Sequence, residues 1–164
     1  MRIFLTGFMG TGKTAVGKLL AQNFGLEFID LDEVIVLDQG KSINDIFAKQ
    51  GEDFFRDVET KCLKEVVSKD NIVLSTGGGV VIKKENRDLL KSQGKVINLN
   101  AGAEEIYKRL KHDNTRPLLA VKNPLVKIKE ILAEREDFYK EADVVINTDG
   151  KSYEEIVKKI RSLL

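Results

Sequence analysis

A phosphate-binding loop near the start of the chain constrains the fold more than any other feature of the sequence. Residues 7–14, which read Gly-Phe-Met-Gly-Thr-Gly-Lys-Thr, fit the pattern G-x-x-x-x-G-K-[ST] at every fixed position. The apolar run Ile3–Thr6 precedes the loop, and an amphipathic helical pattern follows it up to Gly25. A glycine-rich turn between a buried strand and a helix directs backbone N–H groups toward an anion at the helix N-terminus. The sequence therefore predicts an α/β domain that binds a nucleotide.

The loop also predicts which atoms meet the phosphates. Its backbone is expected to surround the β-phosphate, while Lys13 reaches the β- and γ-phosphates and the Thr14 hydroxyl ligates Mg²⁺. The nucleotide-binding residues expected here are Gly10, Thr11, Gly12, Lys13, Thr14 and Ala15. Nucleotide switches, ATPases and kinases share such a loop, so the chemistry has to be inferred from other residues.

The rest of the chain alternates between strand and helix patterns. Apolar runs predict strands at Ile3–Thr6, Glu27–Asp30, Ile72–Ser75, Lys95–Leu99 and Asp143–Asn147. Helical patterns lie at 13–24, 42–47, 52–68, 84–93, 104–110, 125–139 and 153–164, with Gly51 separating the second from the third. Strands separated by helices pair in parallel, with helices on both faces of the sheet. We expect one α/β domain over residues 1–164, in which 31–60 and 112–123 are insertions or lids.

Composition excludes several classes of partner. Lys and Arg number 27 and Asp and Glu number 26, which leaves a formal net charge of +1. A chain that grips a nucleic-acid backbone carries a surplus of positive charge, so no nucleic-acid partner is expected. No run approaches the roughly 18 apolar residues of a membrane helix, so no membrane partner is expected either. The single cysteine, Cys62, cannot form an internal disulfide, and a reducing, cytoplasmic location is expected.

Two helices place charged residues on faces that are otherwise apolar. In the predicted helix 52–68, Glu59 lies in the middle of the apolar face and Arg56 lies at its edge. In the helix that follows Pro124, Arg135 lies at the centre of the apolar stripe. The apolar positions are Phe55, Val58, Cys62 and Val66 in the first helix and Ile128, Ile131, Leu132 and Tyr139 in the second. An unpaired buried charge is costly, so each arginine needs an anionic partner.

Three explanations fit these arginines. The first is a structural ion pair in the core, for which Glu59 is the candidate partner of Arg56. The second is a frayed helix end that leaves Arg135 in solvent. The third is a cavity that both arginines line and that receives an anionic substrate. We favour the third because a guanidinium fork matches a carboxylate, and each charge-assisted hydrogen bond contributes about 1.5–3 kcal/mol.

Three further motifs point to ligand binding. Asp30 and Asp32 stand two residues apart at the end of the second strand. If the backbone stays extended that far, both carboxylates face one side, where one could hold a metal-bound water and the other could orient an acceptor hydroxyl. Helix capping is the alternative. Gly77–Gly79 follow the third strand, which suits close approach of the backbone to a ligand or a flexible turn. Arg116, with Arg109 upstream, lies in a polar loop that either closes over phosphates or is solvated.

The motifs taken together resemble the shikimate kinase family over almost the whole chain. The resemblance rests on residues 7–14, Asp30-Leu31-Asp32, GEDFFRDVE at 51–59, GGG at 77–79, RPLL at 116–119 and REDFY at 135–139. It implies a three-layer α-β-α P-loop kinase fold whose five-stranded parallel sheet has the order 2-3-1-4-5. It also implies ATP- and Mg²⁺-dependent phosphorylation of the 3-hydroxyl of shikimate, in the route to chorismate and aromatic amino acids.

The resemblance implies roles for residues around the substrate. Asp32 is implied to bind the reacting hydroxyl, Arg56 and Arg135 the substrate carboxylate, while Glu59 supports Arg56. The other implied substrate contacts are the backbone of Gly77, Gly78 and Gly79 and the rings of Phe47 and Phe55. Residues 31–60 are then the substrate-binding segment.

It implies further roles around the nucleotide. Asp30 lies near the Mg²⁺ that Thr14 ligates, and Arg116 contacts the phosphates from a lid at 112–123. Arg109 and the turn Thr148-Asp149-Gly150-Lys151 lie near the adenine, although the length of this turn departs from the family pattern and leaves Lys151 less well supported. Lys13, Asp32 and Arg116 are the implied catalytic residues, and we expect a monomer.

Two alternatives remain at this point. One is a P-loop kinase for another small acceptor, either a sugar acid or a nucleoside monophosphate. The other is a nucleotide-gated binding protein without acceptor chemistry, against which the coincidence of Asp32 with Arg56 and Arg135 argues.

Overall fold

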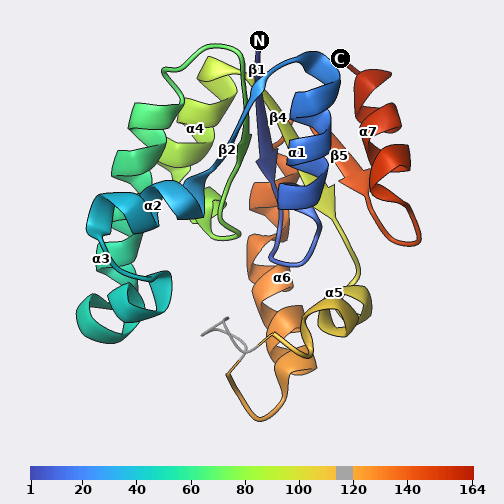
Figure 1. The fold of residues 1–164 in the computed structure, drawn as a ribbon. Coiled ribbons are helices and arrows are strands. Elements are labelled where there is room, and N and C mark those ends of the chain that lie inside the picture. The colour runs from blue at the N-terminus through green and yellow to red at the C-terminus, as the bar shows by residue number, and fades with distance from the viewer. Residues whose placement is uncertain (114–119) are drawn as a thin grey trace.

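Five parallel strands form the centre of the protein. The computed structural model describes residues 1–113 and 120–164 (Figure 1). The strands are β1 (Arg2–Thr6), β2 (Glu27–Asp30), β3 (Ile72–Ser75), β4 (Lys95–Asn100) and β5 (Val144–Asn147). Their order in the sheet is β2-β3-β1-β4-β5, and every pairing is parallel. Both the strand positions and the expected order are confirmed, with bounds that differ by one residue at most.

Helices cover both faces of this sheet (Figure 1). They are α1 (Lys13–Phe24), α2 (Leu31–Gln39), α3 (Ile43–Val66), the short 3₁₀ helix η1 (Val80–Ile82), α4 (Lys84–Gln93), α5 (Ala103–Leu110), α6 (Pro124–Lys140) and α7 (Tyr153–Arg161). Successive side chains of β1 alternate between the two faces. Ile3 and Leu5 pack with α1 and α7, whereas Phe4 packs with α3, α4 and α6. The three-layer α-β-α fold is therefore confirmed.

Glycines end or interrupt helices where the sequence predicts a break. Gly25 terminates α1 in the left-handed conformation, with φ 65°. Gly51, with φ 83° and ψ 173°, breaks α3 into the two helical stretches that the sequence predicted. The second stretch buries Arg56 and Glu59 together with apolar residues such as Phe55 and Val58.

The segment after β2 corrects one expectation. It was expected to stay extended through Asp32, but α2 begins at Leu31 and Asp30 is its N-cap. The Asp30 carboxylate accepts a hydrogen bond from the Asp32 N–H at 2.9 Å, which satisfies a donor that the first helical turn leaves unpaired. Helix capping by Asp30 therefore replaces the expected extended backbone, and the N-terminus of α2 fixes the positions of both carboxylates.

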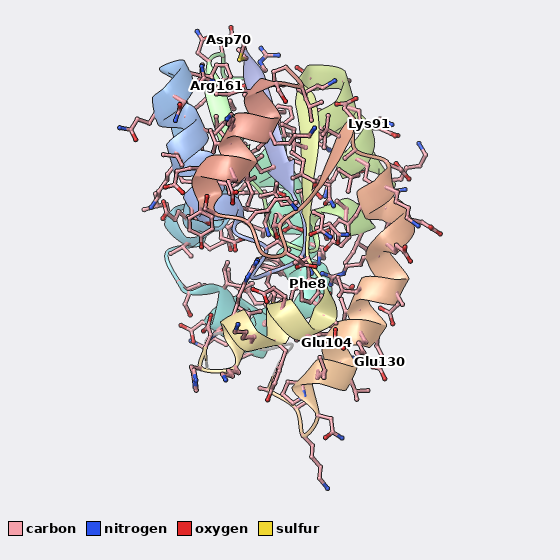
Figure 2. All side chains as sticks on the ribbon, turned by 90° about the vertical axis from the view of Figure 1, so that its right-hand side faces the viewer. Phe8, Asp70, Lys91, Glu104, Glu130 and Arg161 are labelled. Atoms are coloured by element: carbon pink, nitrogen blue, oxygen red, sulfur yellow. The ribbon has the colours of Figure 1, made fainter. Side chains whose placement is uncertain are left out.

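The carboxyl ends of the strands lie at one end of the molecule. Figure 2 shows Phe8, which follows β1, near the middle of the molecule, with Glu104 and Glu130 beyond it on this side and Asp70 and Arg161 at the opposite end. Segments α2–α3 and α5–α6 both extend beyond the sheet at the carboxyl end of its strands (Figure 1). Cys62 is fully buried, as expected. Of the helices in the described ranges, none has the length and apolarity needed to cross a membrane.

Candidate active site

The phosphate-binding loop connects β1 to α1 and holds its lysine against its own backbone. The Lys13 ammonium donates to the carbonyl oxygens of Gly7 at 2.7 Å and Phe8 at 2.9 Å. Gly12, just before α1, has φ 92°, a conformation that most side chains avoid. A cavity of about 270 Å³ opens in front of the loop. Of the six residues predicted to bind the nucleotide, Gly10, Gly12, Lys13, Thr14 and Ala15 line this cavity.

Thr11, the sixth, is turned inward. It is 1% exposed, and its hydroxyl donates to the Phe8 carbonyl at 2.8 Å. Its backbone N–H also donates to the Phe8 carbonyl, at 3.4 Å. Both groups therefore stiffen the loop, and the contact of Thr11 with a phosphate stays a prediction.

Two residues predicted to lie near a metal ion are in contact. Thr14 Oγ1 donates to Asp30 Oδ2 at 3.0 Å, and both residues line the cavity. Mg²⁺ binds oxygen ligands, and it is commonly held by one or two protein groups together with substrate phosphates and water. A hydroxyl and a carboxylate beside a phosphate-binding loop fit that requirement.

The residues expected near the adenine converge on the outer side of the loop. Arg109 donates to the Gly10 carbonyl at 3.0 Å and lies 3.4 Å from Thr148 Oγ1. Lys151 donates to the Asn147 carbonyl at 2.9 Å. Arg109 and the turn after β5 are thus neighbours, but within the described residues neither Arg109 nor Lys151 lines the cavity. Their contact with adenine stays a prediction.

Tyr153 was missed by the sequence analysis. It lines the nucleotide cavity at the start of α7, and its ring lies 3.1 Å from where a Cβ on Gly12 would be. A side chain at position 12 would therefore crowd this ring as well as strain the backbone. The sequence shows only a tyrosine after a turn, which is a weak signal.

A second cavity, of about 430 Å³, lies between α2, α3, α6 and the loop after β3. Predicted substrate residues that line it are Asp32, Phe47, Phe55, Arg56, Glu59, Gly77, Gly78, Gly79 and Arg135. The rings of Phe47 and Phe55 lie 4.8 Å apart, centroid to centroid, and form an apolar wall. The structure therefore brings together every residue that the sequence analysis assigned to the substrate.

Arg56 is held by a buried carboxylate. Its Nη1 donates to Glu59 Oε1 at 2.9 Å, and its Nη2 lies 3.3 Å from Glu52 Oε1. Glu59 is fully buried, and burial raises the pKa of its carboxyl, while the Arg56 guanidinium acts in the opposite direction. The structural ion pair considered for Arg56 is confirmed, and Arg56 nevertheless lines the cavity.

Arg135 differs from Arg56 in its partners. It is 6% exposed, so the explanation by a frayed helix end is wrong. Across residues 1–113 and 120–164 no carboxylate forms an ion pair with it. Its guanidinium lies 5.9 Å from the centroid of the Phe8 ring. A buried guanidinium beside a cavity is suited to an anion from outside the chain.

Gly79 leaves the space that the Arg56 guanidinium occupies. A Cβ on Gly79 would overlap the Arg56 guanidinium, so the loop and the arginine are in direct contact. At Gly77, a Cβ would lie 2.9 Å from Glu59 Oε2 and 3.1 Å from Asp32 Oδ1. The glycines therefore allow the backbone to approach these charged side chains closely, and the contact of this backbone with a ligand stays a prediction.

The two cavities adjoin each other. Met9, Asp32, Gly77 and Gly78 line both of them. Asp32 thus lies between the phosphate-binding loop and the two arginines. Arg116, the predicted lid arginine, falls in residues 114–119 and lies outside the described residues.

These features define a P-loop kinase, because a nucleotide site on the expected sheet adjoins a separate site for an acceptor. Comparison with known proteins identifies the family. The sequence profile of the shikimate kinase family matches residues 9–164. The chain belongs to the shikimate kinase family, whose members are ATP-dependent phosphotransferases of aromatic amino acid biosynthesis.

Individual relatives are similar over nearly the full length. A shikimate kinase from Geobacter metallireducens is 48% identical over 162 residues, which cover 99% of this chain and 90% of the relative. One from Thermodesulfovibrio yellowstonii is 48% identical over 158 residues, or 96% of this chain and 91% of the relative. The solved structure of shikimate kinase from Acinetobacter baumannii in complex with shikimate superposes with a TM-score of 0.96 at 40% identity, covering 99% of this chain and 91% of that one.

Proposed function

We propose that the enzyme transfers the γ-phosphoryl group of ATP to the 3-hydroxyl of shikimate, and that Asp32 is the residue at which donor and acceptor meet. The observation that carries the proposal is the position of Asp32 in the wall of both cavities. The fold-wide similarity to the Acinetobacter baumannii enzyme, which was solved with shikimate, supports the choice of acceptor.

The larger cavity is suited to shikimate in both charge and shape. Arg135, buried and without a carboxylate among the described residues, is proposed to bind the substrate carboxylate together with Arg56. The ring wall of Phe47 and Phe55 is proposed to pack against the cyclohexene ring. With its carboxylate and ring held by these contacts, the substrate is proposed to present a hydroxyl to Asp32, which lines the same cavity.

The transfer itself is proposed to depend on position and charge. The Lys13 ammonium stabilises the negative charge that the phosphoryl group carries during in-line transfer. Asp32 accepts a hydrogen bond from the attacking hydroxyl, orients its oxygen toward the γ-phosphorus and receives its proton as the new P–O bond forms and ADP departs. Thr14 and Asp30 would hold Mg²⁺, which when bound offsets the phosphate charge.

An acceptor panel tests the proposal. ADP release is followed in a coupled assay with shikimate, quinate, gluconate and several nucleoside monophosphates, each with and without Mg²⁺. We expect shikimate to stimulate ADP release far above the rate with ATP alone, and only with Mg²⁺ present. Faster turnover with gluconate or a nucleoside monophosphate would show that the arginine pair serves a different acceptor.

A further inference from the structure

Tyr139 lies behind the substrate cavity and contacts its glycine loop. We propose that Tyr139 is a positioning residue that orients the Gly78–Gly79 peptide toward the bound substrate. The proposal rests on the proposed function only in assigning the larger cavity to shikimate. The sequence placed Tyr139 on the apolar stripe of α6 and gave it no role.

The contact is a short hydrogen bond from a buried hydroxyl. Tyr139 Oη donates to the Gly78 carbonyl oxygen at 2.7 Å, and the residue is 6% exposed. A buried tyrosine hydroxyl requires a partner, and the acceptor here is backbone 61 residues away in the chain, while the Arg135 side chain hydrogen-bonds the same hydroxyl. Burial raises the pKa of the Tyr139 hydroxyl, while the Arg135 guanidinium one turn before it acts in the opposite direction. The hydroxyl therefore stays protonated and donates.

Other carbonyls of the same loop are held from within the loop or from α4. The Val80 and Ile82 N–H groups donate to the carbonyls of Gly77 at 3.2 Å and Gly79 at 3.1 Å. Asn86 and Arg87, at the start of α4, donate to the carbonyls of Val80 at 3.0 Å and Val81 at 2.8 Å. The Gly78 carbonyl is the one that α6 holds, through Tyr139. This hydrogen bond consequently links the loop to the helix that carries Arg135.

Fixing the Gly78 carbonyl also fixes the next amide. The peptide between Gly78 and Gly79 is trans, so the Gly79 N–H points away from the carbonyl and from Tyr139. Gly79 lines the substrate cavity on that other side, whereas Tyr139 does not. Within the described chain, the N–H groups of Gly77, Gly78 and Gly79 have no hydrogen-bond acceptor. The Gly79 N–H is thus presented to the cavity beside the Arg56 guanidinium, ready to donate to a substrate oxygen.

The alternative is that Tyr139 only fills space in the core. Without its hydroxyl, the peptide between the two glycines is restrained only by the hydrogen bonds to the flanking Gly77 and Gly79 carbonyls, because neither residue restricts φ or ψ as other residues do. Rotation would turn the Gly79 N–H away from the substrate without changing the phosphate-binding loop. The two explanations therefore differ in their effect on shikimate relative to ATP.

The test compares Tyr139→Phe with Tyr107→Phe, a matched control on the exposed surface of α5. We expect Tyr139→Phe to raise the KM for shikimate and its calorimetric Kd about 3- to 10-fold, the effect of losing one neutral hydrogen bond. The KM for ATP should stay within twofold, and Tyr107→Phe should match wild type. A lower melting temperature with unchanged shikimate KM and Kd would overturn the proposal and leave Tyr139 a packing residue.

A measurement on the wild-type enzyme covers the case in which the variant does not fold. In protein labelled with ¹⁵N-glycine, the Gly79 amide is expected to shift and to exchange more slowly when shikimate binds. A Gly79 amide that neither shifts nor gains protection would overturn the proposal. Failure of wild type to phosphorylate shikimate would instead refute the proposed function, so the two failures are distinguishable.

Discussion

The substitution Arg135→Met tests whether Arg135 binds the substrate or only stabilises the fold. Methionine retains an unbranched stem of similar length and can pack against Ile128 and Ile131 on the same buried stripe. It removes only the guanidinium. Since each charge-assisted hydrogen bond contributes about 1.5–3 kcal/mol, loss of one such bond should weaken shikimate binding about 10- to 150-fold.

The same substitution should not destabilise the fold. Arg135 is 6% exposed and no described carboxylate forms an ion pair with it, so its contact with the Tyr139 hydroxyl and the charge of nearby Glu59 only partly offset the cost of burying it. Replacing a buried charge with an apolar side chain of similar volume is often neutral or stabilising. We therefore expect the melting temperature of Arg135→Met to equal or exceed that of wild type.

The assay measures the Kd for shikimate by calorimetry and the KM values for shikimate and ATP, with the melting temperature alongside. Arg161→Met, on α7 at the opposite end of the sheet (Figure 2), is the matched control and should behave as wild type. Shikimate methyl ester adds a check on charge, because its affinity should differ little between wild type and Arg135→Met. An unchanged shikimate Kd together with a melting temperature lowered by several degrees would refute the reasoning and make Arg135 structural.

Three further substitutions test the remaining groups. Lys13→Ala should abolish phosphoryl transfer while Lys91→Ala, at an exposed position of α4, retains it; turnover by Lys13→Ala would remove the lysine from the mechanism. Asp32→Asn should lower kcat by about 10²-fold or more, as expected for loss of a general base, with the KM for ATP little changed, and a near-normal kcat would contradict the role of Asp32. Burial raises the pKa of Glu59 above 4.5, so its carboxyl binds a proton more tightly in the folded than in the unfolded state. The free energy of unfolding therefore decreases as pH rises above that value. The melting temperature of Glu59→Gln relative to wild type should therefore rise between pH 4.5 and neutral pH, and a difference that stays constant over this range would show that Glu59 does not titrate there.

Much of the site could be predicted from local sequence because its signals are local. The phosphate-binding loop is a contiguous pattern, and its glycines and lysine act through backbone geometry that the pattern itself requires. Arg135 was identified because a charge on an apolar helical stripe conflicts with burial, which helical periodicity alone reveals. Glu59 lies three residues from Arg56 on one helix, so their pairing also follows from periodicity.

The conformation after Asp30 could not be predicted, because the local sequence is compatible with both an extended strand and a capped helix. The backbone was expected to stay extended from the second strand through Asp32, yet the chain is helical from Leu31 and the Asp30 carboxylate caps the first turn. An aspartate that can cap can equally well remain at a strand end, so the sequence leaves both conformations open. Tertiary packing of α2 against α3 and the sheet decides between them.

The sequence alone determined that this chain binds a nucleotide on an α/β domain and carries arginines that need an anion. The tertiary structure decided how those parts meet: Asp32 between two cavities, Arg56 against Gly79, and the Tyr139 hydroxyl on the Gly78 carbonyl across 61 residues of chain. The physical reason is the separation along the chain of the residues that interact. Loop and helix patterns report on neighbours a few residues apart, whereas a hydrogen bond between a helix and a distant loop exists only once the sheet has brought the two together.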